Sequence, residues 1–239
     1  LIIATADGAQ RSVLRPVDDV WQYVQPLPAG GALLARSWRR GKDNGALYGP
    51  DGRRTATFPL GEAIEDVQTV ASGRIWVSYF DETAASGEES GLTCFDAVGQ
   101  RRWDFNIEGP LPRIDDCYAL NVAGDIAWAY YYRSFTLLRV APDGSTAHWA
   151  TGVSGSKAIA VGDRSVLLYD SYGGEAEPVC HLADFGPGEL INLRRCRLVL
   201  PSGVPFRRGD RLYVTGRGPL LHVIAGTAWY QVDVDALPP

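Results

Sequence analysis

The stretch CFDAVGQRRWDF, from Cys94 to Phe105, decides the fold. An apolar run ends at Asp96, a turn containing Gly99 follows, and the chain returns through Trp103. Asp and Gly tolerate the positive φ angles of tight hairpin turns, so the stretch predicts two antiparallel strands. The turn recurs at Asp7-Gly8, Asp51-Gly52 and Asp143-Gly144, with a weaker copy at Asp184-Phe185-Gly186. The first four aspartates are 44, 45 and 47 residues apart, which indicates a repeat.

A second kind of turn alternates with the first. Gly-centred turns precede apolar strands at Gly30, Gly73, Gly124, Gly162 and Gly209. Each period therefore holds two hairpins, or four strands, which is what one propeller blade of this length requires. No segment sustains helical spacing of apolar residues over three turns. The pattern predicts an all-β chain, a five-bladed β-propeller of four-stranded antiparallel blades, with residues 1–239 as a single domain.

Two arrangements could close the ring. The blade that begins near Gly209 could take its outer hairpin from residues 1–14, so that N- and C-terminal strands pair. Residues 220–224 and 229–234 compete for the same place. Six blades, with one irregular, is the alternative to five.

The hairpin Cys94–Phe105 resembles the outer hairpin of quinoprotein-like and NHL-like propeller blades, with its turn Asp, its Gly and its Trp. The stretch Ile114–Tyr132 and its surroundings resemble uncharacterised bacterial propeller proteins. The resemblance implies an architecture and carries no activity, because propellers include enzymes, binding proteins and scaffolds.

Composition narrows the range of partners. Hydrophobic residues make up 46% of the 239 residues and the net charge is −5, so the chain is globular and a nucleic-acid partner is disfavoured. No apolar run is long enough to span a membrane, and the given sequence opens with no basic-then-apolar leader. We expect a cytoplasmic monomer. The four cysteines permit two disulfides, but we expect free, buried thiols.

Acidic pairs stand where three successive inner strands are expected to begin. They are Asp18-Asp19, Glu65-Asp66 and Asp115-Asp116. Inner strands of a propeller converge on its channel, so Asp19, Asp66 and Asp116 could approach one another and bind Ca²⁺, which prefers carboxylate and carbonyl oxygens. The competing interpretation is that each Asp accepts hydrogen bonds from backbone amides at a turn.

Other polar and aromatic residues fall on connections of the same rim. Asp81, Glu82, Glu88 and Glu89 follow the second strand of the second blade; Tyr131, Tyr132 and Arg133 lie in the third, and Asp170 and Tyr172 in the fourth. Arg39, Arg40 and Lys42 occupy the first, and Arg217 the fifth. The aromatic residues either pack in the core and rim or offer a stacking platform to a planar ligand.

Two functions remain open. The first is a binding or interaction propeller whose acidic, aromatic-edged rim holds a cation, a small polar molecule or a protein, with Asp18, Asp115, Glu82, Tyr131, Tyr132, Arg133 and Tyr172 as ligand contacts. The second is a hydrolase, lyase or cyclase, acting for instance on carbohydrate. It would use Asp19, Asp66 and Asp116 as acid–base residues or metal ligands, with Glu65 or Asp81 as the proton shuttle. No required cofactor is expected, and no nucleophile motif, phosphate loop or dinucleotide fingerprint occurs.

Overall fold

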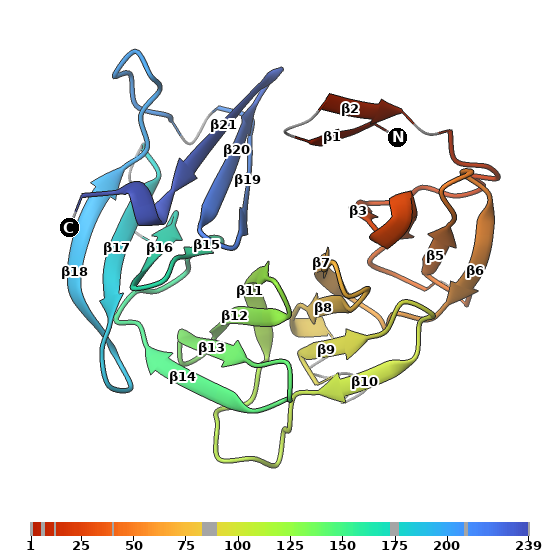
Figure 1. Cartoon of the computed structure of the whole chain (residues 1–239). Coiled ribbons are helices and arrows are strands. Elements are labelled where there is room, and N and C mark those ends of the chain that lie inside the picture. Colours follow the sequence, from red (N-terminus) through yellow and green to blue (C-terminus); the bar gives the residue numbers. More distant parts are fainter. Residues whose placement is uncertain are drawn as a thin grey trace. The chain divides into compact units, whose positions relative to one another are not determined.

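The fold is seen in a computed structural model that describes residues 2–5, 8–11, 13–39, 41–82, 90–172, 177–207 and 210–238. Nearly all regular structure is antiparallel β-sheet (Figure 1). The chain divides into two units, residues 1–115 and residues 116–239, and each is described by itself. Among the described residues, no helix has the length and apolar character needed to cross a membrane.

Unit 1 contains one hairpin and two four-stranded sheets. The hairpin pairs β1 (Ile2–Thr5) with β2 (Gly8–Arg11). The first sheet has the order β3 (Tyr23–Pro26), β4 (Ala32–Ala35), β5 (Gly45–Tyr48) and β6 (Arg54–Phe58), with the 3₁₀-helix η1 (Pro28–Gly30) between β3 and β4. The second sheet contains β7 (Ile64–Thr69), β8 (Ile75–Tyr79), β9 (Leu92–Phe95) and β10 (Arg101–Asp104), also in sequence order.

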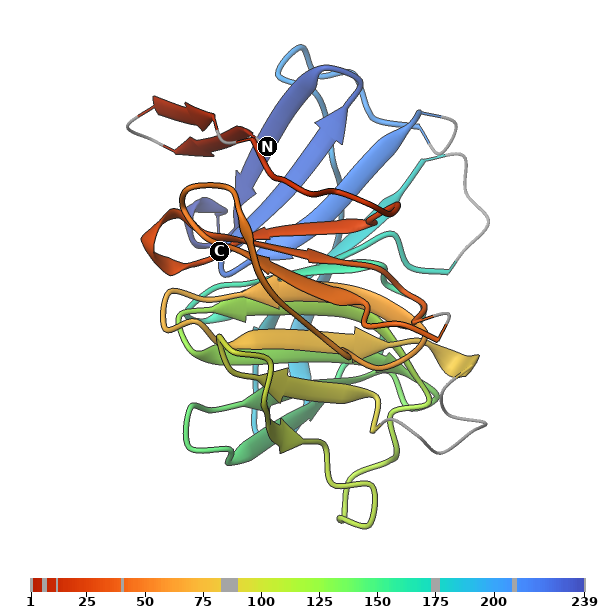
Figure 2. The ribbon, with the colours of Figure 1, turned by 90° about the vertical axis from the view of Figure 1, so that its right-hand side faces the viewer.

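Unit 2 contains three sheets. The first has β11 (Asp116–Ala123), β12 (Ile126–Tyr132), β13 (Thr136–Val140) and β14 (Thr146–Ala150). The second has β15 (Ala158–Val161), β16 (Ser165–Tyr169), β17 (Val179–Phe185) and β18 (Leu190–Arg197). The third has three strands, β19 (Leu212–Arg217), β20 (Leu220–Ala225) and β21 (Ala228–Asp233), and the 3₁₀-helix η2 (Val234–Ala236) follows. Figure 2 shows the short turns that join neighbouring strands at alternate ends of each sheet.

The predicted Asp-Gly turns are confirmed between the outer strands of three sheets. Gly52, Gly99 and Gly144 have φ angles of 76°, 82° and 85°. In each turn the Asp carboxylate accepts a hydrogen bond from the backbone N–H two residues on, at 2.9–3.0 Å. The weaker copy also marks a hairpin, between β17 and β18, but its turn is shifted: Asp184 and Phe185 belong to β17 and the turn runs from Gly186 to Glu189. Asp7 lies outside the described residues.

The Gly-centred turns are confirmed between the first and second strands of four sheets, and the last sheet differs. Asp210 precedes β19, which is the first strand of its sheet rather than the second. The expected inner strand at Val204-Pro205 does not form: Pro205 has no amide hydrogen to donate, and it makes only an isolated bridge with Val199. Residues 220–225 and 228–233 complete this sheet as β20 and β21. Gly209 lies outside the described residues, and closure through the N-terminal strands stays a prediction.

Burial is greatest in the middle strands of the sheets, and the outer strands are more exposed. Every residue of β4, β8 and β15 is buried, whereas β14 alternates between exposed and half-buried residues. The expected tryptophan packing is seen in unit 2, where Trp128 and Trp149 lie 5.5 Å apart and both contact Phe185 of the neighbouring sheet. Because the middle strands are covered on both faces, their side chains can reach a ligand only from strand ends and connections.

Candidate functional site

In unit 1, four of the predicted acidic residues come together where β7 begins and β8 ends. Glu65 and Asp66 belong to β7, and Asp81 and Glu82 follow β8, its antiparallel neighbour. Glu65 interacts with both Asp66 and Glu82, and the Glu82 side chain hydrogen-bonds with Asp81. Partial desolvation, followed by the negative charges of Asp66 and Glu82, raises the pKa of Glu65. Partial desolvation and the hydrogen bond with Asp81 raise the pKa of Glu82. A carboxyl group with a raised pKa can act as a proton donor.

Asp18 and Asp19 are paired with arginines of the same unit. Asp18 accepts two hydrogen bonds from Nη1 of Arg54, at 2.8 and 3.0 Å, and this pairing lowers the pKa of Asp18. Asp19 forms an ion pair with Arg36, while the Val20 N–H donates to its carboxylate and is the main cause of the lowered pKa of Asp19. These charges are compensated within the first sheet. Asp19 therefore matches the interpretation as a turn aspartate that accepts from a backbone amide, whereas Asp18 accepts from an arginine side chain.

The three aspartates proposed as metal ligands do not occupy equivalent places in their sheets. Trp76 and Trp128 lie on the second strands β8 and β12, opposite Gln68 and Asn121. If the two tryptophans are aligned, the registers make Asp66 equivalent to Ala119, three residues beyond Asp116. Asp66 accepts hydrogen bonds from the Val67 N–H at 2.7 Å and the Gln68 amide at 3.2 Å. The alignment of acidic pairs was therefore wrong, because it followed sequence spacing and ignored register.

A calcium site has no set of ligands in the described part of the chain. No group of three or more His, Cys, Asp or Glu residues among the described residues could hold a metal ion. Asp115 lies 3.7 Å from Arg113, and Asp116 stands opposite Tyr132 in the pairing of β11 with β12. Glu88, Glu89 and Arg40 lie outside the described residues. Calcium binding stays a prediction that metal titration would check.

Unit 2 carries an aromatic patch, which we define as Tyr118, Tyr132, Phe135 and Tyr172. The Tyr118 ring stacks on Tyr132 with centroids 5.9 Å apart and planes at 14°. Phe135 lies between the three tyrosines, with ring centroids 5.7–6.2 Å away. The hydroxyl groups of Tyr118 and Tyr172 are 2.6 Å apart and form a hydrogen bond. Tyr132 is 40% exposed and Tyr172 58% exposed, so the patch presents ring faces to solvent.

Backbone irregularities determine the positions of the Tyr118 and Phe135 rings. The pairing of β11 with β12 steps from Cys117–Tyr131 to Ala119–Tyr130, which leaves Tyr118 as the extra residue of a β-bulge. Bulges re-aim side chains out of the normal alternation. Phe135 has a φ of 49°, and its carbonyl accepts a hydrogen bond from the Thr151 hydroxyl at 2.6 Å. A non-Gly residue in this conformation persists only where its surroundings hold it.

A glycine brings Tyr172 into the patch. Gly155 has a φ of 77°, and a Cβ at this position would lie 2.3 Å from the Tyr172 ring. The ring therefore packs directly on the glycine backbone, and the Tyr172 N–H donates to the Ser154 carbonyl at 2.8 Å. Desolvation and the hydrogen bond with Tyr172 raise the pKa of Tyr118 above its ordinary value.

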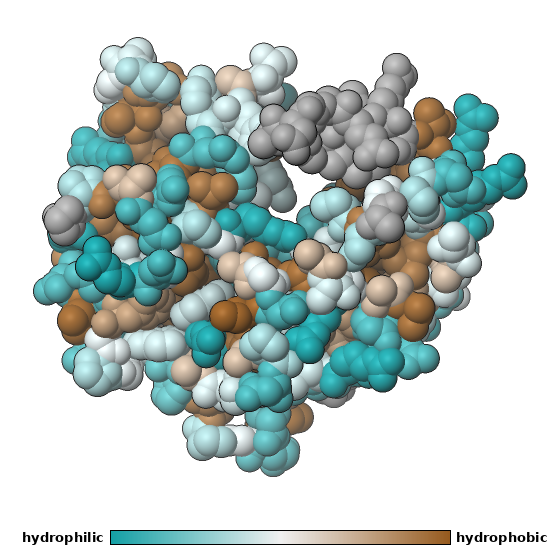
Figure 3. Space-filling model, in the orientation of Figure 1, coloured by the Kyte–Doolittle hydropathy of each residue, from teal (hydrophilic) through white to brown (hydrophobic). Residues whose placement is uncertain are grey.

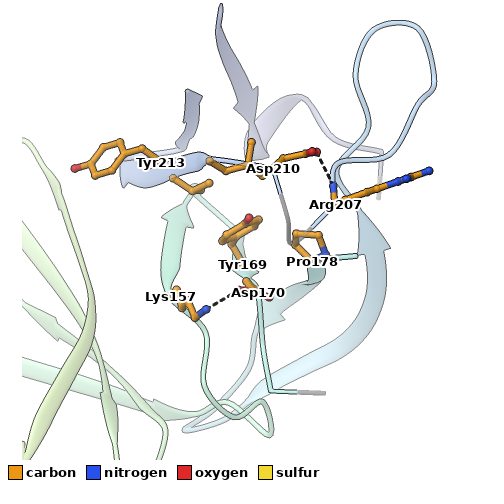
Figure 4. Close-up of a pocket in the computed structure, with 9 residues that line it drawn as sticks. Lys157, Tyr169, Asp170, Pro178, Arg207, Asp210 and Tyr213 are labelled. Carbon is orange, nitrogen blue, oxygen red and sulfur yellow. Dashed lines mark hydrogen bonds and ion pairs between the residues drawn. The ribbon is translucent and has the colours of Figure 1, made fainter. Parts of the chain in front are cut away.

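A polar pocket of about 380 Å³ opens beside the connection that carries Tyr172 (Figure 4). It is lined by Lys157, Tyr169, Asp170, Pro178, Arg207, Asp210, Leu212, Tyr213 and Val214. Lys157 forms an ion pair with the buried Asp170 at 2.9 Å, and the Asp210 carboxylate accepts from the Arg207 N–H at 2.9 Å. Asp170 and Tyr172 belong to the same connection after β16, so this segment borders both the pocket and the aromatic patch.

The structure thus separates the ligand contacts predicted for the third and fourth blades into exposed residues and a buried one. Tyr132 and Tyr172 are brought together in the aromatic patch. Tyr131 is fully buried, and its prediction as a ligand contact was wrong because β12 is covered on both faces from Ala127 to Tyr131. Arg133 is exposed, with a φ of 64°, in the turn before Phe135. Tyr118 and Phe135 were missed, since neither the bulge nor the left-handed backbone leaves a signal in the pattern of residues.

Similarity to solved structures defines the class of the protein as a β-propeller. The matches include a gluconolactonase from Xanthomonas campestris, at 16% identity and a TM-score of 0.57, covering 90% of this chain and 73% of that one. Hydrazine synthase from Kuenenia stuttgartiensis matches at 8% identity and a TM-score of 0.55, covering 88% of this chain and 65% of that one. A catalytically inactive virginiamycin B lyase from Staphylococcus aureus with quinupristin matches at 14% identity and a TM-score of 0.55, covering 95% and 74%.

These likenesses are to propeller-type proteins of diverse function, and they show the fold alone. No protein-family model and no curated protein matches the sequence. The chain spans less than two thirds of the hydrazine synthase chain, and about three quarters of the other two. Function therefore has to be argued from the sites themselves.

Proposed function

We propose that this protein is a five-bladed β-propeller, one blade per sheet, that binds a small polar molecule on unit 2. The binding surface would be the aromatic patch and the adjoining pocket. The ligand class that fits is a sugar or sugar-like ring, which has an apolar face for stacking and hydroxyl groups for polar contacts. The observation that carries the proposal is the convergence of four aromatic rings from three segments of the chain, two of the rings about half exposed.

The pocket supplies the charged hydrogen-bonding groups that the aromatic patch lacks. Lys157 offers a cationic donor, its side chain is 64% exposed, and Asp170 and Asp210 offer acceptors. Opposite charges side by side favour a neutral ligand with several hydroxyl groups over a strongly anionic one. On the face shown in Figure 3, hydrophilic and hydrophobic residues interleave. The lining of the pocket, which mixes charged and apolar side chains, suits a small polar ligand better than an extended apolar partner.

The test is saturation-transfer NMR on the whole chain with glucose, gluconate and cellobiose as probes. We expect transfer to the ring protons of at least one sugar. Tyr172→Ala should weaken that binding roughly two- to tenfold, because one aromatic stacking contact contributes about 0.5–1.5 kcal/mol. Trp229→Ala is the matched control, since Trp229 is 55% exposed on β21 of the same unit and lies outside the patch. No transfer to any probe, or equal losses in both variants, would contradict the proposal.

A second candidate function, an enzyme, is favoured by the acidic group of unit 1. Glu65 and Glu82 both have raised pKa values beside a second carboxylate. Such a pair can divide the roles of general acid and general base in hydrolysis or elimination. The gluconolactonase and the virginiamycin B lyase are enzymes by name, so a propeller of this type is compatible with catalysis.

The assay for this candidate is hydrolysis of glucono-δ-lactone and of nitrophenyl glycosides by the whole chain. Glu65→Gln should abolish any turnover, because the amide cannot transfer a proton. Glu108→Gln, an exposed residue of the same unit, should leave turnover unchanged. Turnover that persists in Glu65→Gln would remove this carboxyl group from the mechanism.

A further inference from the structure

Two of the four cysteines face each other across neighbouring strands. Cys180 on β17 and Cys196 on β18 are direct partners in the antiparallel register. Directly opposed residues of such a pair have Cα atoms about 4.5–5.5 Å apart. Disulfides form at Cα separations of about 4.4–6.8 Å. The backbone therefore already holds both residues at a separation that a disulfide accepts.

The two thiols differ in accessibility and in acidity. Cys180 is fully buried, whereas Cys196 is half-buried. The Cys180 thiol hydrogen-bonds with Cys196, which lowers the pKa of Cys196 and raises the pKa of Cys180. The positive charge of Arg194 also lowers the pKa of Cys196. The thiol that a reagent can reach is therefore the one that ionises more readily, and a thiolate is the attacking species in thiol–disulfide exchange.

The remaining cysteines lack this arrangement. Cys94 and Cys117 are both buried, and each thiol contacts a backbone carbonyl of its own strand, those of Phe95 and Ala119, at 3.6 Å. They match the expectation of free cysteines that act as small hydrophobic residues.

We propose that Cys180 and Cys196 form a reversible disulfide when the protein meets a low-molecular-weight disulfide such as oxidised glutathione. The Cys196 thiolate attacks one sulfur of glutathione disulfide, forms a mixed disulfide and releases one glutathione. Cys180 then loses its proton and attacks the Cys196 sulfur, releasing the second glutathione. Two protein thiols are oxidised to one disulfide, and one glutathione disulfide is reduced to two thiols.

The bond would act next to the proposed binding pocket. Tyr169, Cys180 and Cys196 are successive partners across β16, β17 and β18. Tyr169 lines the pocket, and the backbone of Asp170, another lining residue, hydrogen-bonds with the Cys180 sulfur. A cross-link here ties the outer strand β18 to the strand that supports the pocket wall. We expect the oxidised protein to unfold at a higher temperature than the reduced protein.

The experiment treats the reduced whole chain with oxidised glutathione and follows intact mass, free thiols under denaturing conditions, and peptide mapping. We expect a loss of two hydrogen masses, a fall from four free thiols to two, and a peptide that links Cys180 to Cys196. Dithiothreitol should reverse all three changes. The readout does not depend on any ligand, so its failure is separate from a failure of the proposed function.

Single variants identify the attacking thiol. Cys196→Ser should keep its three thiols free, and Cys180→Ser should retain one glutathione on Cys196. Cys94→Ser is the matched control and should still form the cross-link. A wild-type protein that keeps four free thiols, that stops at the mixed disulfide, or that links other cysteines would overturn the proposal. Because the peptide map is made on the wild-type chain, the test stands even if a variant fails to fold.

Discussion

Replacement of Asn121 by alanine should destabilise unit 2 more than any exposed substitution in it. Asn121 lies on β11, is fully buried, and makes three hydrogen bonds with other sheets. Its Nδ2 donates to the carbonyls of Ile159 at 2.8 Å and Gly218 at 3.0 Å, and its Oδ1 accepts from the Gly218 N–H at 2.9 Å. One side chain on β11 therefore contacts β15 and the turn between β19 and β20, and so joins the three sheets of the unit.

The size of the effect follows from what the substitution leaves behind. The Gly218 N–H would lose its acceptor in a buried place, at a cost of about 1–3 kcal/mol. Each of the two carbonyls would lose one hydrogen bond, which contributes about 0.5–1.5 kcal/mol apiece. The Gly218 carbonyl keeps a second donor, the Val161 N–H at 2.7 Å. We expect a total loss of roughly 2–6 kcal/mol in the free energy of unfolding.

Urea unfolding followed by tryptophan fluorescence measures this loss, and amide exchange at Gly218 localises it. The matched control is Ser145→Ala, which removes one exposed side-chain hydrogen bond to Asp143 and should change stability by less than about 0.5 kcal/mol. Asn121→Asp should be worse than alanine at neutral pH, because it turns a second oxygen toward two carbonyls, and it should recover in part when acid protonates the carboxylate. A loss below about 1 kcal/mol for Asn121→Ala, or unprotected Gly218 exchange in the wild type, would refute the reasoning.

Three further outcomes follow from the same structure. Gly155→Ala should lower the free energy of unfolding by roughly 1–3 kcal/mol and shift the Tyr172 ring signals in NMR spectra, because the new Cβ meets that ring at a strained φ. Gly152→Ala, with a φ of 65° and no described atom within 4 Å of its Cβ, should leave the Tyr172 ring signals in place. Burial raises the pKa of Tyr130 to about 12, so the stability it contributes is complete below about pH 10 and is lost as the pH rises toward 12; Tyr130→Phe should flatten this alkaline slope in unfolding titrations. Glu65→Gln should raise the melting temperature at pH 7 and leave it nearly unchanged at about pH 3, which is below the ordinary pKa of glutamate, so that the carboxyl is protonated in both states.

The sequence predicts the sheets better than it predicts the site, for a physical reason. Asp51, Asp96 and Asp143 mark hairpins because a local hydrogen bond and a positive φ fix each turn within a few residues. The last sheet was misassigned because Gly209-Asp210 resembles the Gly-centred turns that join first and second strands. The strand expected at Val204-Pro205 does not form, and Pro205 has no amide hydrogen to donate to a neighbouring strand. Residues close in the sequence determine a turn, whereas a strand also requires hydrogen bonds to a neighbouring strand.

The candidate site depends on register, which spacing in the sequence does not reveal. Acidic dipeptides at similar intervals suggested one ring of carboxylates, yet Asp18 and Asp19 pair with arginines and Asp66 caps its own strand. Tyr132 and Tyr172, which stay predicted ligand contacts, lie at a strand end and on a connection, where side chains leave the covered faces. Tyr118 escaped detection because one extra residue in β11 turned it outward.

A bulge of the same kind occurs in the candidate sites of both units. In β7 the pairing with β8 steps from Ile64–Tyr79 to Asp66–Ser78, so Glu65 is the bulged residue, as Tyr118 is in β11. With Trp76 and Trp128 aligned, Glu65 and Tyr118 fall at the same position of the repeat. One position therefore supplies the residue with the raised pKa in the acidic group and the stacked ring in the aromatic patch. A bulge removes its side chain from the alternation that builds the core, so this position can change chemistry without disturbing the sheet, and substitutions there should alter binding or proton transfer more than folding.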